Sequence, residues 1–184
     1  MKVIGIIPAR WGATRFEGKL LADIQGKPMI RHVWERAKQS RLLNEVMIAC
    51  DDQRILKAAK GFGAKAVLTS KDHLSGTDRI SEAVQSIDVD IVVNIQGDEP
   101  LMEASVIDAL AKVFLDDDRC LMATAIKRIE TQEELKNPHV VKVVIDEHNN
   151  ALYFSRSIIP YNRGNQDIRG IPYYKHLGIY AYRK

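Results

Sequence analysis

The sequence predicts an α/β fold with a mostly parallel central sheet and a smaller antiparallel extension. Two observations lead to this prediction. Short β-branched runs alternate with helical patterns through the first two thirds of the chain, and repeated βα units of this length indicate a parallel sheet with helices on both sides. From Leu121 onward, strand-like runs follow one another with little helix between them, which favours antiparallel pairing.

The first half begins with a buried strand at Lys2–Ile7 that ends at Pro8. Pro28 opens a helix, because proline suits the first helical position, and this helix has one apolar face at Ile30, Val33, Trp34 and Ala37. Three more strand–helix pairs follow. Their strands are expected at 46–50, 64–68 and 91–95, and their helices are expected after Asp51 or Asp52 as cap, from 75–78, and around 106–114.

The last third is expected to hold strands at 121–126, 140–145, 151–154 and 173–182, with a hairpin turn at Asn149-Asn150 and a flexible loop at 162–170. We interpret residues 1–184 as a single domain, with a nucleotide-binding core at 1–120 and an extension at 121–184 for sugar binding and dimerisation. The chain stops at Lys184 directly after a strand-like run. Either that strand lies at an accessible sheet edge or a C-terminal portion is missing, and we favour the second.

Composition places the chain among ordinary globular proteins, since 46% of its 184 residues are hydrophobic and 28% are charged. A net charge of +3 gives no support to a nucleic-acid or membrane binder. Cys50 and Cys120 have no CxxC spacing and are interpreted as buried, reduced thiols. No run suits a signal peptide or a membrane span, so we expect a cytoplasmic protein.

The segment 7–19 follows the first strand and concentrates positive charge in Arg10, Arg15 and Lys19. Because it follows a strand, this segment lies at the carboxyl end of the parallel sheet, where open α/β folds bind ligands. Backbone amides, arginines and a lysine together suit the phosphates of a nucleoside triphosphate. The motif is not a Walker loop, because Leu20 follows the lysine. A solvated basic loop is the alternative.

The segment 94–100, Asn-Ile-Gln-Gly-Asp-Glu-Pro, follows the strand at 91–95. Two carboxylates at a strand end suit Mg²⁺ held beside substrate phosphates, and Asp98 is the better ligand because Glu99 is placed to cap the next helix. The alternative is a polar turn with a capping acid.

The segment 75–79, Ser-Gly-Thr-Asp-Arg, starts a helix and presents free amides to a base or phosphate. Arg79 could instead form a surface ion pair, which is the commoner fate of an arginine.

Five ordered motifs resemble those of the CMP-Kdo synthetases, the 3-deoxy-manno-octulosonate cytidylyltransferases. They are IPARWGATRFEGK, SGTDRI, VVNIQGDEP, YFSRSIIPY and YYKHLGIYAYRK, and they cover essentially the whole chain. The resemblance implies a Rossmann-like nucleotidyltransferase fold, CTP as donor, Kdo or a close acidic eight-carbon relative as acceptor, Mg²⁺ as cofactor and a homodimer. It also implies pyrophosphate release and a role in lipopolysaccharide biosynthesis.

The resemblance assigns roles to matching positions of this sequence. Arg10, Arg15 and Lys19 would hold the triphosphate and support catalysis, with Ala9, Ser75, Gly76, Arg79 and Gln96 completing the CTP site. Asp98 would bind Mg²⁺, and Arg156, His176 and Tyr180 would face the sugar. A guanidinium suits a sugar carboxylate, which agrees with the role of Arg156. His176 has a plain alternative as a partly buried hydrogen-bonding residue.

The sequence also departs from the family pattern. Ala13 stands where the family commonly has serine, and Glu17 and Leu20 stand where it has prolines, which predicts a less pre-organised loop. The resemblance further implies that the family's C-terminal portion, with a second acidic metal ligand, is lacking; such a chain would be impaired or inactive. The alternatives are a related enzyme that uses amino-Kdo, sialic acid or a sugar phosphate, and a non-catalytic nucleotide-binding module.

Overall fold

The computed structural model describes residues 1–12, 16–164 and 167–184. The chain divides into two compact units. Unit 1 comprises Met1–Ala123 together with Ile179–Lys184, and unit 2 comprises Thr124–Gly178. The internal boundary expected after residue 120 lies close to the end of the first stretch. The last six residues differ from the expectation, because they return to unit 1 as part of its sheet.

Unit 1 is built on a sheet whose four parallel strands run in the order β5-β4-β1-β6. The strands are β1 (Val3–Ala9), β4 (Glu45–Cys50), β5 (Lys65–Leu68) and β6 (Ile91–Asn94). The end of β10 (Tyr174–Arg183) pairs antiparallel with β6, with Tyr180 opposite Asn94. This arrangement confirms the predicted mostly parallel sheet.

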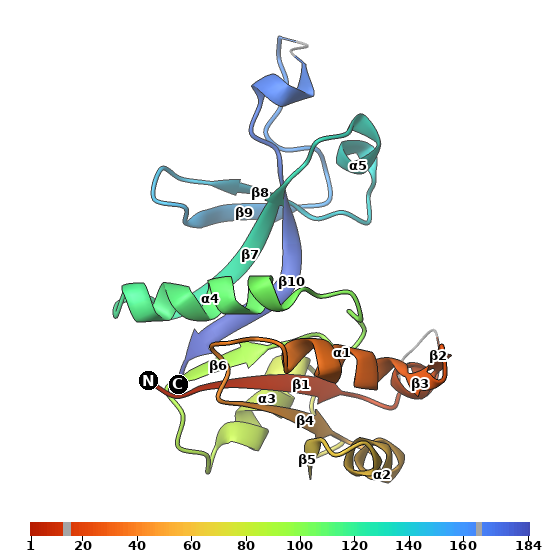
Figure 1. Cartoon of the computed structure of the whole chain (residues 1–184). Helices are drawn as coiled ribbons and strands as arrows, with labels where there is room; N and C mark the ends of the chain where they lie inside the picture. The colour runs from red at the N-terminus through yellow and green to blue at the C-terminus, as the bar shows by residue number, and fades with distance from the viewer. Residues whose placement is uncertain (13–15, 165–166) are drawn as a thin grey trace. The chain divides into compact units, whose positions relative to one another are not determined.

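Four helices cover this sheet: α1 (Met29–Ala37), α2 (Gln53–Gly61), α3 (Gly76–Val84) and α4 (Ala104–Asp116). Helix α3 packs on one face, whereas α1 and α4 contact each other on the opposite side (Figure 1). Because both faces are covered, β1 and β6 are buried almost throughout, as expected for parallel strands. The core under α3 consists of Ile4, Ile6, Met47, Ala49, Ile80, Ala83, Val84 and Val92.

Side-chain caps fix where two of these helices begin. Of the two candidate caps for α2, Asp52 is the cap, since its carboxylate accepts from the Arg54 amide. Helix α3 begins with a full capping box between Ser75 and Asp78. The capping box thus fixes the start of α3 at Gly76, directly after Ser75.

A short hairpin between β1 and α1 was not expected from the sequence. It follows a 3₁₀ turn, η1 (Lys19–Leu21), and consists of β2 (Asp23–Ile24) and β3 (Lys27–Pro28). Its tight turn uses Gly26 at φ 80°. Pro28 ends β3 and lies immediately before the first helical residue, Met29, so α1 begins one residue later than predicted.

Unit 2 is mostly antiparallel, as predicted. Strand β7 (Met122–Arg128) leads into it, and β8 (Lys142–Ile145) pairs with β9 (Ala151–Ser155) and with the start of β10. Asn149, at φ 64°, shapes the predicted hairpin turn. Two elements were not predicted from the sequence. They are α5 (Gln132–Lys136), which Thr131 caps, and η2 (Ile168–Gly170), which lies inside the expected flexible loop. Strand β10 is not at a sheet edge, because both β6 and β7 pair with it.

The two cysteines differ in their surroundings. Cys50 is buried as expected, and this burial raises the pKa of its thiol to about 11. Cys120 is partly exposed, so the expectation that it is buried is wrong. We therefore expect a thiol reagent at pH 8 to modify Cys120 and to spare Cys50 in the folded protein, and to modify both in denaturant. Peptide mass spectrometry after brief labelling measures this, and rapid native labelling of Cys50 would contradict its placement in the core.

None of the helices that the structure describes is long and apolar enough to cross a membrane.

Candidate active site

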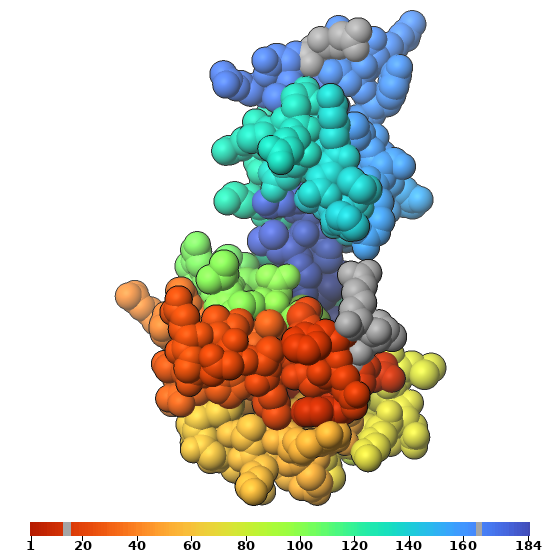
Figure 2. All heavy atoms as spheres, turned by 90° about the vertical axis from the view of Figure 1, so that its right-hand side faces the viewer, coloured from red at the N-terminus to blue at the C-terminus, as the bar shows by residue number. Residues whose placement is uncertain are grey.

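A pocket of about 190 Å³ lies in unit 1, where the carboxyl ends of β1 and β6 meet the start of α3. Figure 2 shows the red residues at the end of β1 beside the yellow segment that leads into α3. The pocket is lined by Pro8, Ala9, Arg10, His73, Leu74, Ser75, Gly76, Arg79 and Gln96. It therefore gathers residues from all three motifs singled out in the sequence, at the sheet end where such folds bind ligands.

Two glycines allow the backbone to approach Pro8 closely. A Cβ on Gly76 would lie 3.2 Å from the Pro8 ring, and a Cβ on Gly97 would lie 3.2 Å from the Pro8 carbonyl oxygen. Any larger residue at Gly97 would push the backbone of the 96–98 turn away from β1. The absence of a side chain at Gly76 and Gly97 thus allows the three motifs to pack closely around the end of β1.

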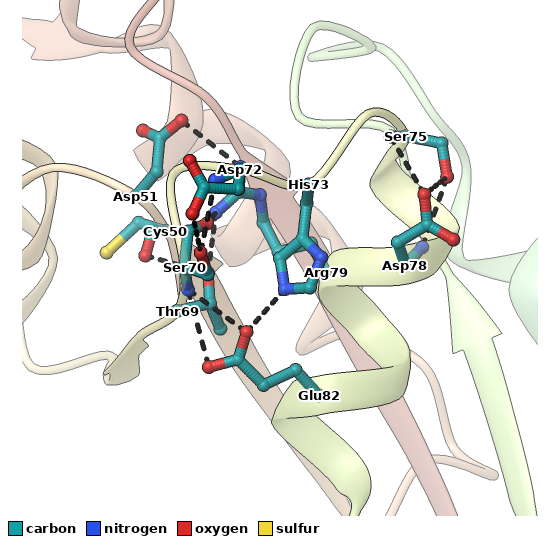
Figure 3. A network of polar contacts seen from close by, with 10 residues as sticks. All are labelled: Cys50, Asp51, Thr69, Ser70, Asp72, His73, Ser75, Asp78, Arg79 and Glu82. Atoms are coloured by element: carbon teal, nitrogen blue, oxygen red, sulfur yellow. Dashed lines mark hydrogen bonds and ion pairs between the residues drawn. The ribbon is translucent and has the colours of Figure 1, made fainter.

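Arg79 is the centre of a buried polar network (Figure 3). Its guanidinium donates to Asp51 at 3.1 Å, to the Thr69 hydroxyl at 2.6 Å and to the Ser70 carbonyl at 3.1 Å. Arg79 is only 2% exposed, so the alternative of a surface ion pair is wrong. The guanidinium lines the pocket but is already bound to protein groups, which favours a supporting role beside any nucleotide.

Asp51 is the residue that sequence reasoning missed, since it was considered only as a helix cap. Its carboxylate also accepts from the Trp11 amide at 2.9 Å, and only 7% of the residue is exposed. Asp51 therefore joins the start of the loop after β1 to Arg79 on α3. A buried acid directly after a strand was the available signal, but the sequence alone did not identify its partner.

Ser75 and Gln96 also make contacts within the protein. The Ser75 hydroxyl donates to Asp78 at 2.7 Å and accepts from the Asp78 amide, so it acts as the cap of α3. The Gln96 amide group donates to the Asn94 side chain at 3.0 Å. These bonds fix both side chains at the rim of the pocket without a ligand.

His73 lines the pocket and was not predicted. Its ring contacts Glu82 of α3, and Glu82 also accepts from the Ser70 amide at 3.0 Å. The hydrogen bond from the Ser70 backbone, followed by the one from His73, holds the pKa of Glu82 below its usual range. Glu82 thus ties the segment 70–73 to α3 at the pocket edge (Figure 3).

This lowered pKa predicts a pH dependence. Because Glu82 is more acidic in the folded state, its stabilising effect is complete above the ordinary carboxyl pKa of about 4.3 and is lost as the pH falls through the lowered value. We expect the free energy of unfolding to fall less steeply with decreasing pH in Glu82→Gln than in the wild type. NMR titration of the wild-type protein measures the pKa of the Glu82 carboxyl. A pKa at the ordinary carboxyl value would contradict the predicted lowering.

Lys19 and Asp98 lie next to each other, although 79 residues separate them in sequence. Their ion pair is 2.8 Å long, and both side chains are substantially exposed. Arg10 lines the pocket, whereas Arg15 lies outside the residues that the structure describes. The two predicted roles of Lys19 and Asp98, phosphate binding and metal binding, therefore fall on adjacent groups.

The surroundings of Asp98 can be tested for Mg²⁺. Among the residues described, no group of three or more His, Cys, Asp or Glu side chains could enclose a metal ion. A dedicated protein cage is thus not formed by this part of the chain. A single exposed carboxylate fits the usual manner of Mg²⁺ binding, in which one or two carboxylates hold the ion together with substrate phosphates and water.

In unit 2, the side chains of Arg156 and Lys142 donate hydrogen bonds to backbone carbonyl oxygens of the loop 137–140. Arg156 donates to Pro138 and His139, and the buried Lys142 donates to Asn137, Val140 and the Arg156 carbonyl. Burial, and then the charge of Arg156, lowers the pKa of Lys142. The loop is therefore held by two cations, and Lys142 fixes the backbone at Arg156.

The other two predicted sugar residues lie on β10. His176 is half-buried, contacts the Thr124 hydroxyl at 2.8 Å and packs edge-on against Phe154. Burial lowers the pKa of His176, which favours the neutral ring. Tyr180 belongs to unit 1, where it stacks with Tyr182 and burial raises its pKa. The structure thus assigns Arg156 and His176 to unit 2 and Tyr180 to unit 1.

Comparison with known proteins identifies what this chain is similar to. The cytidylyltransferase family model matches residues 4–184. The 3-deoxy-manno-octulosonate cytidylyltransferase of Syntrophus aciditrophicus is 51% identical, over all of this chain and 74% of that protein. The enzyme of the same name from Geotalea uraniireducens is 47% identical, over all of this chain and 76% of that protein.

A solved structure agrees with these relatives. CMP:2-keto-3-deoxy-manno-octonic acid synthetase complexed with CTP matches with a TM-score of 0.92 and 45% identity, over all of this chain and 74% of that one. The similarity confirms the nucleotidyltransferase fold. This chain spans about three quarters of the length of these relatives.

Proposed function

This chain belongs to the cytidylyltransferase family, and on that premise we propose that it transfers CMP from CTP to 3-deoxy-manno-octulosonate (Kdo) with release of pyrophosphate. The observation that carries the proposal is the pocket in unit 1. It brings together six of the eight residues expected to bind CTP, namely Ala9, Arg10, Ser75, Gly76, Arg79 and Gln96. A solved relative with this fold is complexed with CTP.

The reaction is an in-line attack by the anomeric hydroxyl of Kdo on the α-phosphorus of CTP. The hydroxyl O–H bond breaks and its proton passes to water, a new oxygen–phosphorus bond forms, the bond to the bridging oxygen of the β-phosphate breaks, and pyrophosphate leaves. The protein has little covalent chemistry to perform, so catalysis rests on positioning and on neutralising charge. Arg10, Arg15 and Lys19 supply positive charge to the phosphates, and Arg79 and Asp51 hold the loop that carries them.

We propose Mg²⁺ as the cofactor, with Asp98 as its protein ligand beside Lys19. When bound, the ion would neutralise phosphate charge and favour attack at phosphorus. Lys19 contributes a cation that the protein holds in place by its ion pair with Asp98.

We assign recognition of the acidic sugar to Arg156, His176 and Tyr180. The guanidinium of Arg156 suits the sugar carboxylate, and its backbone is fixed by Lys142. A neutral His176 can donate or accept a hydrogen bond to a sugar hydroxyl.

The wider setting follows from the same premise. We propose a cytoplasmic enzyme that acts as a homodimer and supplies activated sugar for lipopolysaccharide. Sedimentation analysis tests the dimer directly, since a monomer at micromolar concentration would contradict it.

The acceptor is tested by mass spectrometry of the product. The chain is incubated with CTP and Mg²⁺ and, in parallel, with Kdo, its amino-sugar analogue, sialic acid or a sugar phosphate. We expect CMP-Kdo as the main product. A product only with sialic acid or a sugar phosphate would point to another sugar nucleotidyltransferase, and no product despite CTP binding would point to a non-catalytic module.

A further inference from the structure

Trp11 closes the base of the loop between β1 and η1. Its carbonyl accepts from the Gly18 amide at 3.1 Å, and its indole Nε1 donates to the Glu17 carboxylate at 2.6 Å. Both bonds join the first residues of the loop to its last residues. Trp11 is thereby held against Glu17 and Gly18, directly before Lys19.

Arg54 completes this arrangement from helix α2. Its guanidinium carbon lies 3.5 Å from the centre of the Trp11 ring, at cation–π distance. Asp52 fixes the same guanidinium through two bonds of 2.8 and 2.7 Å. We call Trp11, Glu17, Gly18 and Arg54 the clasp.

Gly18 is required by the clasp for two reasons. Its φ of 68° is a left-handed conformation that side chains rarely adopt, and a Cβ there would lie 2.7 Å from the Trp11 ring. The ring therefore packs directly on the glycine backbone, and no other residue fits without moving one of them.

The clasp stands between the two described cations that are expected to bind phosphate. Arg10 precedes Trp11 and Lys19 follows Gly18. The Trp11 amide is also bound by Asp51, which holds the pocket residue Arg79. A change in the clasp is therefore expected to move Arg10 and Lys19 relative to each other, and it removes no group that lines the pocket.

We propose that the clasp is a positioning device that sets the affinity for the nucleotide triphosphate by fixing the spacing of Arg10 and Lys19. Glu17, Trp11 and Arg54 are positioning residues, because they act through the loop rather than on the substrate. The inference rests on the proposed function, since it takes CTP as the ligand of this site.

The first test removes one bond of the clasp and then restores it. Isothermal titration of CTP with Mg²⁺ is compared for the wild-type chain, Glu17→Ala and Glu17→Gln. Loss of one hydrogen bond is expected to weaken CTP binding about fivefold in Glu17→Ala. Glu17→Gln keeps an oxygen that accepts from the indole, so it should bind CTP nearly as the wild type does.

The second test uses a matched pair of glycines. Gly18 and Gly26 both have positive φ, at 68° and 80°, but a Cβ on Gly26 would meet nothing within 4 Å. Gly18→Ala and Gly26→Ala therefore share the backbone strain, and only the first collides with Trp11. We expect Gly18→Ala to weaken CTP binding about tenfold relative to Gly26→Ala, at similar melting temperatures.

The outcomes separate the two proposals. If the wild-type chain does not bind CTP, both the proposed function and the clasp's role are overturned. If it binds CTP but Glu17→Ala and Gly18→Ala bind equally well, the clasp's role alone is overturned. A failure of Glu17→Gln to restore binding would also overturn it, because a charge effect rather than the hydrogen bond would then be responsible.

Discussion

Replacing Lys19 by alanine is expected to lower the rate of pyrophosphate release by about 10²-fold. In the proposed reaction the ammonium neutralises charge that grows on the phosphates in the transition state, and one such group is worth on the order of 3 kcal/mol. In the structure, Lys19 is held by Asp98 at 2.8 Å, next to the pocket turn at 96–98. Steady-state kinetics with CTP, Mg²⁺ and Kdo measure the effect on kcat and KM.

Lys27 offers a matched control for this experiment. It also forms a 2.8 Å pair with a carboxylate, Glu35, and its side chain is 39% exposed against 40% for Lys19. Lys27 pairs with Glu35 of α1 rather than with a residue of the 96–98 turn, so Lys27→Ala should leave the rate within about twofold of wild type. Equal rates in Lys19→Ala and Lys27→Ala would remove Lys19 from the catalytic machinery.

Replacing Asp51 by alanine is expected to destabilise the protein by about 3 kcal/mol, because it leaves the buried Arg79 charge without its partner. For a chain of this length, the loss corresponds to a fall in Tm of roughly 6–12 °C. The Trp11 amide also loses its acceptor, so CTP binding should weaken together with stability. Thermal unfolding followed by circular dichroism measures the first effect.

Asp52 is the natural control, since it is the next residue and also a carboxylate. It caps α2 and binds the exposed Arg54, whereas the Arg79 guanidinium donates to Asp51, Thr69 and Ser70. Asp52→Ala should therefore lower Tm by clearly less than Asp51→Ala. A similar fall in both variants would mean that the buried ion pair contributes little beyond a helix cap.

The parallel half of the fold could be predicted because each element has a strong local signal. Val3–Ala9 is apolar on both faces, as a strand covered by helices must be, and Ser75 with Asp78 spells out a helix start. The antiparallel half was predicted in outline only. Helix α5, with five residues, is too short to show an apolar periodicity, and the 23–28 hairpin depends on a glycine turn within a polar stretch.

The pocket could be predicted from motifs that follow strand ends, since parallel strands bring those ends together. The contacts that hold it could not be predicted. The pairs Asp51–Arg79 and Trp11–Glu17 depend on which side chain is buried and which way it points, and neither spacing nor composition reveals this. The same reason explains why a surface ion pair remained an alternative for Arg79, although its side chain is almost completely buried.

The proposed nucleotide site is tested most directly by titrating the wild-type chain with CTP and, separately, with ATP, GTP and UTP, each with Mg²⁺. We expect saturable binding of CTP at one site per chain, clear preference over the other nucleotides, and weaker binding in Arg10→Ala. No binding of CTP, or CTP binding that Arg10→Ala leaves unchanged, would contradict the assignment of the pocket at the ends of β1 and β6 as the nucleotide site.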